Sequence, residues 1–587
     1  MTTVDAQEDA QAEPEAAGPF RQWILAGVAG LAVSLLIVAP FFWLGNASGH
    51  DFEFHAASWL EVASQWKQHI AYPRWDEWAN YGFGEPRFVF YPPLSWMLGA
   101  ALSFVVPWNA VPAAFIVLTQ TVACLCAFAL ARRWLPRRGA MAAAMFYTAN
   151  PYALLVIYMR SDFAEQLAAA FLPLLFLAAL ELAGISKRGK RGIGKTAALF
   201  ALVFAVIWLA NAPAGVLASY AMALLFGWEA LSGREWRIPL RGAGGLALGL
   251  GLAAFYLVPA AYEQSWVNIG QVLSTGLLPA ENFLYTAGND PEHTLFNWIA
   301  STIAVLLALL TAGAAMVAIR WVRRANGQID AARQKEFRGL LVVSAAALLL
   351  MLRVTTIFWL VLPKLRFVQF PWRWMAILAV PGAVFLGVAG RRRLGWLWVI
   401  AALAISAGTG LYLVRHTWWD ADDIPTLRAA LVQGKGLEGT DEYDPAGDDH
   451  TNLPQAAPHV RILAAGDEDK PATAAVIVQR WTAEDRRVRV HSREPVRLAL
   501  RLLNYPAWRV EVNGRVVTTE HPEQTEQMIV AVPAGDSQVR IEFGRTADRT
   551  IGGAISGVSL LVAIVLLARP RPTEQVPEER PVAAEIL

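Results

Sequence analysis

The sequence contains few charged residues for its length. Asp, Glu, Lys and Arg make up only 17% of its 587 residues, whereas 56% are hydrophobic, and the mean hydropathy is +0.37. Soluble domains carry about a quarter charged residues, so a chain of this size and composition has too little polar surface to fold in water. The composition therefore predicts a polytopic α-helical membrane protein.

Cysteine is scarce as well. The only two cysteines, Cys124 and Cys126, lie in one apolar run. Side chains two positions apart on a helix diverge, so these two cannot form a disulfide with each other. We expect both to pack as small apolar side chains and to take no part in redox chemistry.

Long apolar runs divide the chain into membrane spans. A helix needs about 20 predominantly apolar residues to cross a bilayer. Twelve stretches are predicted to span the membrane: residues 23–44, 111–131, 139–158, 164–184, 196–211, 214–231, 242–262, 298–319, 339–351, 374–389, 395–414 and 551–567.

A further apolar stretch, residues 94–106, is short for a crossing. If it does not cross, the basic clusters of the membrane part share one face with Arg21, as the positive-inside rule requires. This topology places both termini in the cytoplasm of a cell inner (plasma) membrane, and residues 94–106 in a helix at the outer interface. The clusters are Arg132/Arg133/Arg137/Arg138, Lys187/Arg188/Lys190/Arg191/Lys195, Arg234/Arg237/Arg241, Arg320/Arg323/Arg324/Arg333/Lys335/Arg338 and Arg391/Arg392/Arg393.

The polar segments complete the predicted domain organisation. Residues 1–20 are acidic and poor in apolar side chains, which is typical of a disordered tail, here cytoplasmic. A transmembrane domain covers residues 21–414, with an external first loop and its juxtamembrane helices at 45–109. An external β-rich domain covers residues 415–549. The last transmembrane helix at 550–568 and a cytoplasmic tail at 569–587 follow.

Alternating apolar and polar residues predict β-strands in that external domain, as in residues 487–491, 496–502, 508–512 and 539–543. Asn513-Gly514, between residues 508–512 and 515–518, is a two-residue hairpin signal. We therefore expect a small β-sandwich-like domain, tethered to the membrane by the last span.

The first loop opens with residues that suit catalysis. Asp51 and Glu53 lie close to the predicted hydrocarbon boundary, where a charge is costly unless it is paired or used. They could share a divalent cation such as Mg or Mn, or one could act as a general base. His50 and His55 could orient or ligate. An alternative is that Asp51 is only the N-cap of an amphipathic helix that follows it.

Two other external corners carry charge. In residues 158–165, Arg160 accompanies Asp162 and Glu165, which could also form a simple interfacial ion pair. Residues 363–374 place Lys364, Arg366 and Arg373 on the face that the positive-inside rule depletes of cations, which indicates an anion such as phosphate. The combined set suits a reaction in which arginines stabilise a lipid-anchored phosphate leaving group while a carboxylate deprotonates an incoming hydroxyl.

At these residues the sequence resembles the GT-C class of integral-membrane glycosyltransferases. The closest resemblance is to bacterial and archaeal membrane proteins called "6-pyruvoyl-tetrahydropterin synthase-related". A string at Tyr505 resembles the external domain of YfhO-like proteins. The motifs are His50-Asp51-x-x-Phe54-His55, Tyr72-Pro-Arg-Trp75, Gly82-x-Gly84-x-Pro86, Phe90-Tyr-Pro-Pro-Leu94, Arg160-x-x-x-x-Glu165 and Gln369-Phe-Pro-Trp-Arg373.

The resemblance implies an inverting transfer of a sugar from a polyprenyl-phosphate donor to a glycan, lipid or protein acceptor at the outer face, with no nucleic acid involved. It implies Asp51 as catalytic base or metal ligand. The sequence departs from the acid pair of other members by having Asp51-Phe-Glu53, and our hypothesis takes Glu53 as the partner of Asp51. The expected donor-phosphate ligands are Arg74, Arg160, Arg366 and Arg373. The expected supporting residues are His50, His55, Asp162, Glu165, Tyr91 and Gln369, and the expected sugar-stacking residues are Trp75 and Trp78.

Two other functional classes are open. A flippase or transporter of the same lipid-linked sugar would need ionisable residues along its spans, which hold few beyond Glu181 and Glu229. A non-enzymatic cell-envelope assembly protein would use the external domain as its working part.

Overall fold

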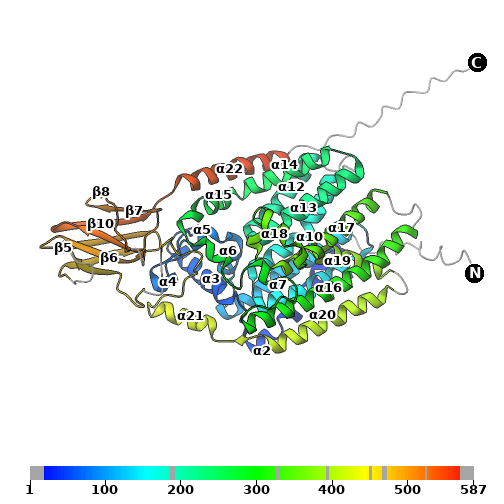
Figure 1. Ribbon diagram of the computed structural model, residues 1–587, viewed down its shortest axis with the longest axis horizontal. Helices are drawn as coiled ribbons and strands as arrows, with labels where there is room; N and C mark the ends of the chain where they lie inside the picture. The colour runs from blue at the N-terminus through cyan, green and yellow to red at the C-terminus, as the bar shows by residue number, and fades with distance from the viewer. Residues whose placement is uncertain are drawn as a thin grey trace, which may run out of the picture.

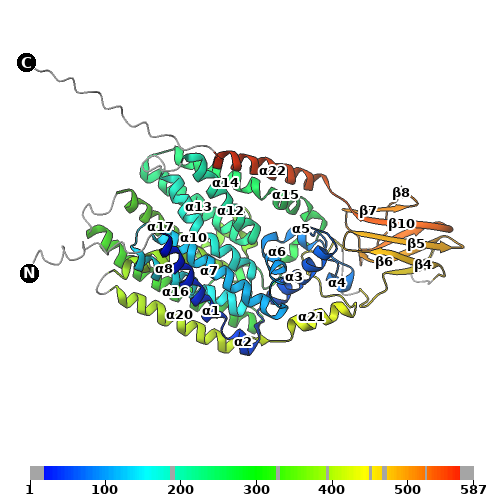
Figure 2. The same cartoon turned by 180° about the vertical axis from the view of Figure 1, so that it is seen from behind.

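The computed structural model describes residues 19–184, 192–324, 331–391, 395–447, 453–465, 472–522 and 525–568. Its helices form an elongated bundle with a β-domain at one end, and helices α3 to α6 lie between the two (Figure 1 and Figure 2). Most of the two predicted tails, residues 1–18 and 569–587, lies outside the described residues.

Ten helical stretches of the described chain are long and apolar enough to cross a membrane. They match ten of the twelve predicted spans, and the polytopic helical fold is confirmed. These stretches contain α1 (Pro19–Val38) with α2 (Phe41–Leu44), α7 (Val111–Ala131), α8 (Arg137–Thr148) with α9 (Pro151–Leu155), α10 (Phe163–Ala183), α12 (Ile193–Ala210), α13 (Ala212–Gly233), α16 (Pro291–Arg324), α19 (Met375–Ala389), α20 (Trp396–His416) and α22 (Ala547–Ala568).

The predicted span at residues 242–262 is a bent helix pair and not one straight helix. Its two parts, α14 (Arg237–Leu252) and α15 (Ala254–Tyr262), meet at an angle of 76°. At the break, the hydroxyl of Ser556 in α22 accepts a hydrogen bond from the Phe255 backbone N–H at 2.8 Å and donates to the Gly251 carbonyl at 3.0 Å. A side chain inserted into the hydrogen-bond ladder therefore satisfies the backbone groups that the bend frees.

The predicted span at residues 339–351 is likewise part of a bent pair. The chain turns by 94° between α17 (Ala331–Leu350) and α18 (Thr356–Val361). Trp359 is buried beneath the bend, and its indole N–H donates to the Leu350 carbonyl, the last residue of α17, at 3.1 Å. The apolar pattern alone located both spans, but side chains from other segments or later turns set the bends.

The first loop folds into four short helices between the bundle and the β-domain: α3 (Phe52–Lys67), α4 (Ala79–Gly82), α5 (Arg87–Phe90) and α6 (Pro93–Leu102). α6 begins at a proline, where a helix needs no N–H partner, and has only ten residues. It is too short to cross a bilayer, as the sequence predicts for residues 94–106. Just before α3, β1 (Asn46–Ala47) pairs with β2 (Trp419–Asp420), and α21 (Asp423–Val432) follows β2.

The C-terminal β-domain consists of two antiparallel sheets. One has the order β4-β5-β10-β7-β8 and the other β3-β6-β9. Apolar side chains of β5 and β10, such as Val490 and Ile541, share one core with Leu498 and Leu500 of β6. The bounds are β3 (Val460–Ala464), β4 (Ala475–Trp481), β5 (Asp485–Ser492), β6 (Val496–Leu503), β7 (Trp508–Val512), β8 (Arg515–Val516), β9 (Gln527–Val532) and β10 (Gly535–Phe543).

The predicted hairpin at Asn513-Gly514 is confirmed. β7 and β8 pair directly across it, and both turn residues have positive φ, 50° and 77°. This is the backbone that a two-residue turn between twisted strands requires, and Asn-Gly adopts it at low cost.

Candidate functional site

Asp51 lies at the start of α3, in a turn held by the backbone of another segment. The N–H groups of His50 and Asp51 donate to the carbonyls of Met159 and Arg160 at 3.2 and 2.8 Å. Asp51 occupies the N-cap position of α3, but its side chain makes no capping hydrogen bond. The alternative view of Asp51 as only a helix cap is therefore wrong, because its carboxylate is used elsewhere.

Arg160 ends an irregular helical turn. Residues Val156–Arg160 form a π-helical turn, and Ser161 follows with a φ of +52°, in the left-handed region that few non-glycine residues adopt. The Ser161 hydroxyl donates to the Ala47 carbonyl at 2.7 Å and accepts from the Gly49 N–H at 3.0 Å. These bonds fasten the unusual turn to the first loop and direct Arg160 toward Asp51.

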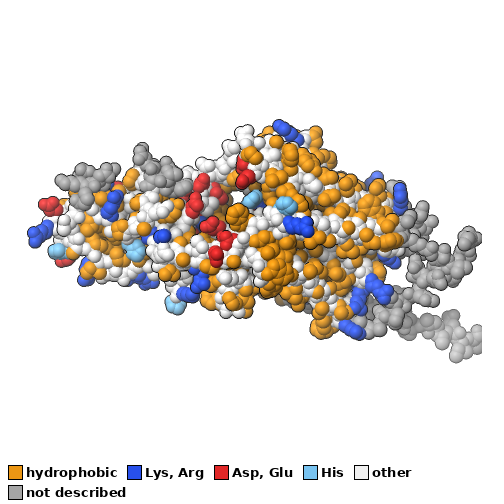
Figure 3. Space-filling view, turned by 90° about the horizontal axis from the view of Figure 1, so that it is seen from below, with side chains coloured by type: hydrophobic (Ala, Val, Ile, Leu, Met, Phe, Trp, Pro, Cys, Tyr) orange, Lys and Arg blue, Asp and Glu red, His pale blue; other side chains and the backbone are white. Residues whose placement is uncertain are grey.

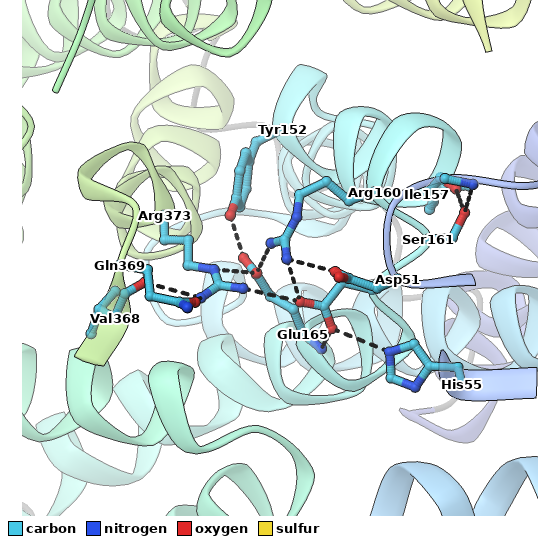
Figure 4. A network of polar contacts seen from close by, with 12 residues as sticks. Asp51, His55, Tyr152, Ile157, Arg160, Ser161, Glu165, Val368, Gln369 and Arg373 are labelled. Atoms are coloured by element: carbon cyan, nitrogen blue, oxygen red, sulfur yellow. Dashed lines mark hydrogen bonds and ion pairs between the residues drawn. The ribbon is translucent and has the colours of Figure 1, made fainter. Parts of the chain in front are cut away.

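The guanidinium group of Arg160 contacts three carboxylates at once (Figure 4). Its Nη2 lies 2.7 Å from Asp51 Oδ2 and 3.1 Å from Asp162 Oδ2, and its Nη1 lies 2.8 Å from Glu165 Oε2. Asp162 also caps α10, because its Oδ1 accepts the Glu165 N–H at 2.8 Å. The interfacial ion pair considered from the sequence is thus one part of a larger cluster.

Arg373 enters the same cluster from the 3₁₀ turn Pro371–Trp374, just before α19. Its Nε lies 3.1 Å from Glu165 Oε2, and its Nη2 lies 3.4 Å from Asp162 Oδ2. Three carboxylates therefore face two guanidinium groups, which leaves the cluster with a formal charge of −1 when Asp51, Asp162 and Glu165 are ionised.

Gln369 positions Arg373 from a strained turn. Gln369 has φ +66° and ψ −56°, and the Phe370 N–H donates to the Val368 carbonyl at 2.7 Å, which defines a γ-turn with positive φ. The Gln369 side chain accepts from Arg373 Nη1 at 3.4 Å and donates to the Val272 carbonyl at 2.8 Å. Such strain persists only where surrounding contacts enforce it, and it is concentrated at functional sites.

Two further polar side chains complete the cluster. The Tyr152 hydroxyl donates a short hydrogen bond to Glu165 Oε1. His55 is buried, and its Nε2 lies 3.7 Å from Asp162 Oδ1. Glu165 therefore accepts hydrogen bonds from one tyrosine and two arginines.

The cluster shifts the pKa values of nearby groups. Burial alone would raise the pKa of Asp162, but Arg160, His55 and Arg373 together hold it well below its ordinary value. Burial raises the pKa of Tyr91, and the charges of Asp162 and Asp51 raise it further. Tyr91 is therefore a neutral phenol that can donate a hydrogen bond beside the cluster.

Only one carboxylate of the cluster is open to solvent. The side chains of Arg160, Asp162, Glu165 and Arg373 are at most 6% exposed, whereas that of Asp51 is 35% exposed. A buried ion-pair network surrounds one accessible carboxylate, which is the arrangement that an accessible base on a rigid support requires.

Two cavities border Glu165 within the bundle. One is lined by Gln120, Tyr152 and Gln166 together with small alanine side chains and has a cavity volume of about 30 Å³. The other, of about 10 Å³, lies between Glu165 and Arg373. Neither polar atom of the buried Gln166 amide has a hydrogen-bond partner among the described residues.

The sequence interpretation missed Tyr152 and Gln166. Both lie in apolar helices, and the available signal was a polar group at membrane depth, which is costly unless it is used.

The structure places Arg74 and Trp75 in a different region. Trp75 is completely buried, with ring centroids 5.3 Å from Trp508 and 5.7 Å from Phe543. The predicted sugar-stacking role of Trp75 is therefore wrong, because β-domain rings cover it. Arg74 lies over the Tyr72 ring at 4.4 Å, and its charge interacts with Glu263, Glu484 and Arg549 of the same junction. This contradicts the predicted phosphate contact.

The other predicted residues lie outside the ion-pair cluster. Trp78 is half-buried at the junction, where its carbonyl accepts the Leu437 N–H at 2.8 Å. The exposed His50 packs edge-on against Phe296 at 4.5 Å, and Arg366 is exposed beside Phe367.

Glu53 faces away from Asp51. Its side chain is exposed, and partial burial together with the charges of Asp423 and Glu438 raises its pKa. Figure 3 shows acidic side chains gathered between the β-domain and the bundle. The Asp51 carboxylate is thus paired with Arg160, whereas the charges that act on Glu53 are those of Asp423 and Glu438.

The predicted divalent cation does not fit this geometry. Asp51 is paired with Arg160, and Glu53 turns toward Asp423. In the part of the chain that the structure describes, no group of three or more His, Cys, Asp and Glu side chains is arranged to hold a metal ion.

The fold and site define a polytopic membrane protein with one accessible carboxylate on a buried charge cluster. Residues 88–420 match the family described as "6-pyruvoyl-tetrahydropterin synthase related domain; membrane protein". The chain belongs to this family, as the motif resemblance predicts. The match includes Arg160, Glu165 and Arg373, and it ends before the strands of the β-domain. The chain matches no curated protein.

Two solved structures resemble the chain. One is the Archaeoglobus fulgidus oligosaccharyltransferase in the apo form, with a TM-score of 0.40 and 14% identity over 73% of this chain and 57% of that one. The other is the archaeal oligosaccharyltransferase AglB from Archaeoglobus fulgidus in complex with an inhibitory peptide and a dolichol-phosphate, with a TM-score of 0.36 and 16% identity over 71% and 56%. The chain thus spans somewhat more than half the length of these structures.

Proposed function

We propose that the protein is a membrane glycosyltransferase that moves a sugar, with inversion, from a polyprenyl-phosphate donor to a glycan, lipid or protein acceptor at the outer face of the membrane. The observation that carries this proposal is the accessible Asp51 carboxylate on an otherwise buried arginine–carboxylate cluster. The motif resemblance supports the GT-C class, and the basic clusters on the opposite side support the placement at the outer face.

In the proposed reaction Asp51 accepts the proton of an acceptor hydroxyl. The hydroxyl oxygen attacks the anomeric carbon from the side opposite the phosphate, and the new C–O bond forms as the bond to the phosphate oxygen breaks. The polyprenyl phosphate leaves with the bonding electrons, and the sugar is inverted. No step is assigned to a metal ion.

Arg160 supports this role without neutralising the base. An arginine paired with one carboxylate would lower the basicity of that carboxylate. Here the guanidinium also faces Asp162 and Glu165, so its charge is shared by three carboxylates. Arg160 therefore orients Asp51, while Arg373 and Tyr152 hold Glu165 in place.

The test is Asp51→Asn in the full chain, reconstituted with a panel of short-chain polyprenyl-phosphate monosaccharides. Release of polyprenyl phosphate and transfer of sugar are followed together. Loss of a general base costs about 10²–10⁴ in rate, so we expect at least a 100-fold loss of transfer with normal donor binding.

The matched control is Asp422→Asn, which removes an exposed carboxylate at the start of α21. We expect it to keep activity. Full transfer activity in a folded Asp51→Asn variant would overturn the proposal. Movement of the intact donor across the bilayer without bond cleavage would instead identify a flippase.

A further inference from the structure

The segment between α17 and α19 forms a hook with an apolar outer surface. After the 94° bend, α18 lies across the end of α17. Leu360 and Val361 are 71% and 62% exposed, and Ile357 and Phe358 are exposed beside them. In a membrane protein such a surface faces lipid, so α18 presents an apolar face to the acyl chains at this end of the bundle.

Two cations follow directly after this apolar surface. The short turn Leu365–Val368 buries Leu365 and Val368 and leaves Lys364 and Arg366 exposed. Lys364 Nζ and Arg366 Cζ each lie 5.0 Å from the centre of the Phe367 ring. One aromatic ring therefore contacts both cations.

These two cations have no carboxylate partner among the described residues. Neither Lys364 nor Arg366 makes an ion pair with any residue that the structure describes. Lys364 has a φ of +61°, a conformation that is unfavourable for lysine. The turn is held from α13, because the Tyr220 hydroxyl donates to the Pro363 carbonyl at 2.8 Å. The turn that carries the two cations thus maintains an unfavourable backbone conformation.

Lys364 and Arg366 are better placed to bind a phosphate than Arg160 and Arg373 are. Both of those guanidinium groups are buried and already occupied by carboxylates. A phosphate that bound them would have to displace buried ion pairs, which is costly. Lys364 and Arg366 are accessible and unpaired, so an anion gains from them without breaking any protein contact.

The chain links the two sets of cations over a short distance. Phe370 lies three residues after Phe367, and its ring is 5.6 Å from Arg160 Cζ and 5.0 Å from Arg373 Cζ. A phosphate at Lys364 and Arg366 therefore lies next to the segment that borders the Asp51 cluster.

The geometry points to Lys364, Phe367 and Arg366 as the site that takes the phosphate of the lipid-linked donor, with its polyprenyl chain lying along the exposed face of α18. Arg160 and Arg373 are then positioning residues for Asp51 and not phosphate ligands. This inference rests on the proposed function. It assigns the donor phosphate to Lys364 and Arg366, which we call the clamp, in place of the expected contacts with Arg160 and Arg373.

The experiment compares Lys364→Gln/Arg366→Gln with wild-type protein in nanodiscs of neutral lipid. The probe is a short-chain polyprenyl phosphate without sugar, and binding is measured by native mass spectrometry and tryptophan quenching. We expect the double variant to weaken binding at least tenfold and to raise KM for the glycosylated donor, with kcat changed less than threefold. Both side chains are exposed, so the fold is retained.

The matched control is Arg415→Gln/Arg428→Gln, which removes two exposed cations on α20 and α21. We expect it to bind as wild type does. Inorganic phosphate at the same concentration is expected not to compete, because it lacks the chain that lies on α18. Competition by inorganic phosphate as strong as that by the lipid would contradict the α18 part of the inference.

Failure of the inference and failure of the proposed function are distinguishable. Wild-type lipid binding and KM in the double variant would overturn the clamp, while Asp51→Asn still tests transfer. Loss of lipid binding in the double variant, with Asp51→Asn fully active, would support the clamp and overturn the role of Asp51.

Discussion

Two buried charge networks lie where the helices meet the first loop, and they differ in what they leave open. In the Asp51 cluster one carboxylate is 35% exposed, and cavities border Glu165. In the second network Arg549 donates two hydrogen bonds of 2.8 Å to Glu263, which also accepts from Tyr505 at 2.6 Å. All three of these side chains are buried.

The second network connects separate parts of the chain, and we call Glu263, Tyr505 and Arg549 the joint. Glu263 follows α15, Arg549 begins the last helix, and Tyr505 belongs to the β-domain, so one ion pair fastens three parts of the chain. A closed network of buried side chains holds structure, whereas a network with an accessible member is suited to chemistry. The comparison teaches that burial and charge alone do not identify an active site.

The largest expected effect is a loss of transfer activity when the arginine of one network, but not of the other, is replaced. Arg549→Met leaves the buried Glu263 without its cation, and Arg160→Met leaves three carboxylates with Arg373 as the one remaining arginine of the cluster. Breaking a buried ion pair costs about 3–5 kcal/mol. We expect both to unfold at lower temperature, but only Arg160→Met to lose at least 100-fold in transfer activity where both are folded. The only cysteines, Cys124 and Cys126, are buried in the bundle, so a thiol-reactive dye reports its unfolding.

Equal loss of transfer in folded Arg549→Met would break the comparison, because the joint would then belong to the catalytic machinery. Arg509→Gln serves as a control for both variants. It removes an exposed pair with Glu511, which is worth about 0–1 kcal/mol.

An intermediate effect on stability is expected at Gly82, which packs against Arg501 of the β-domain. Gly82 has a φ of +90°, and a Cβ there would lie 2.6 Å from the Arg501 guanidinium, which donates to the Tyr81 carbonyl at 2.8 Å. Gly82→Ala should therefore combine backbone strain of about 1–2 kcal/mol with overpacking of about 1–3 kcal/mol. Hydrogen exchange should show faster exchange in β6 and α4.

Gly514→Ala measures the cost of the backbone strain without the overpacking. Gly514 has a φ of +77°, but nothing lies within 4 Å of its Cβ position. We expect its cost to be limited to the strain, with α4 unaffected. If Gly82→Ala were no less stable than Gly514→Ala, the Arg501 side chain would make room for the added methyl group, and the expected overpacking would be absent.

The smallest expected effect is a pH dependence of the joint. Burial raises the pKa of Glu484 from 4.5 to about 7, although Arg74 and Arg549 oppose the shift. The folded protein then holds this proton more tightly than the unfolded chain. The resulting stability is fully present below pH 4.5, declines as the pH rises and is lost by about pH 7.

Glu484→Gln should remove this contribution. We expect the melting temperature of the variant to fall less steeply between pH 4.5 and 7 than that of the wild type. Identical slopes would show that Glu484 does not carry a raised pKa in the folded protein.

The sequence predicted the elements better than the bends. Apolar length located the spans, period-two alternation located β5, β6, β7 and β10, and Asn513-Gly514 located the hairpin. The bend at Ala253 could not be predicted, because Ser556, which satisfies the freed backbone groups, lies about 300 residues later in the chain.

The site was predicted in part. Asp51, Arg160, Glu165 and Arg373 were selected from charged residues at the predicted outer face and from the motif resemblance. The structure brings all four together. Trp75 was misread because an aromatic residue in a polar loop suits a sugar and a domain interface equally well. Tyr152 was missed because a tyrosine in an apolar span is common.

Local composition and periodicity, which short-range physics controls, determined the membrane class, most of the spans and the strands. Tertiary structure alone decided which charges meet, because ion pairs such as Arg160–Asp51 join residues 109 positions apart. It also decided that Arg74 and Trp75 lie at the junction with the β-domain, and that Lys364 and Arg366 have no ion-pair partner in the described part of the chain. Whether a charged side chain is neutralised depends on neighbours that the fold supplies, and no local pattern encodes them.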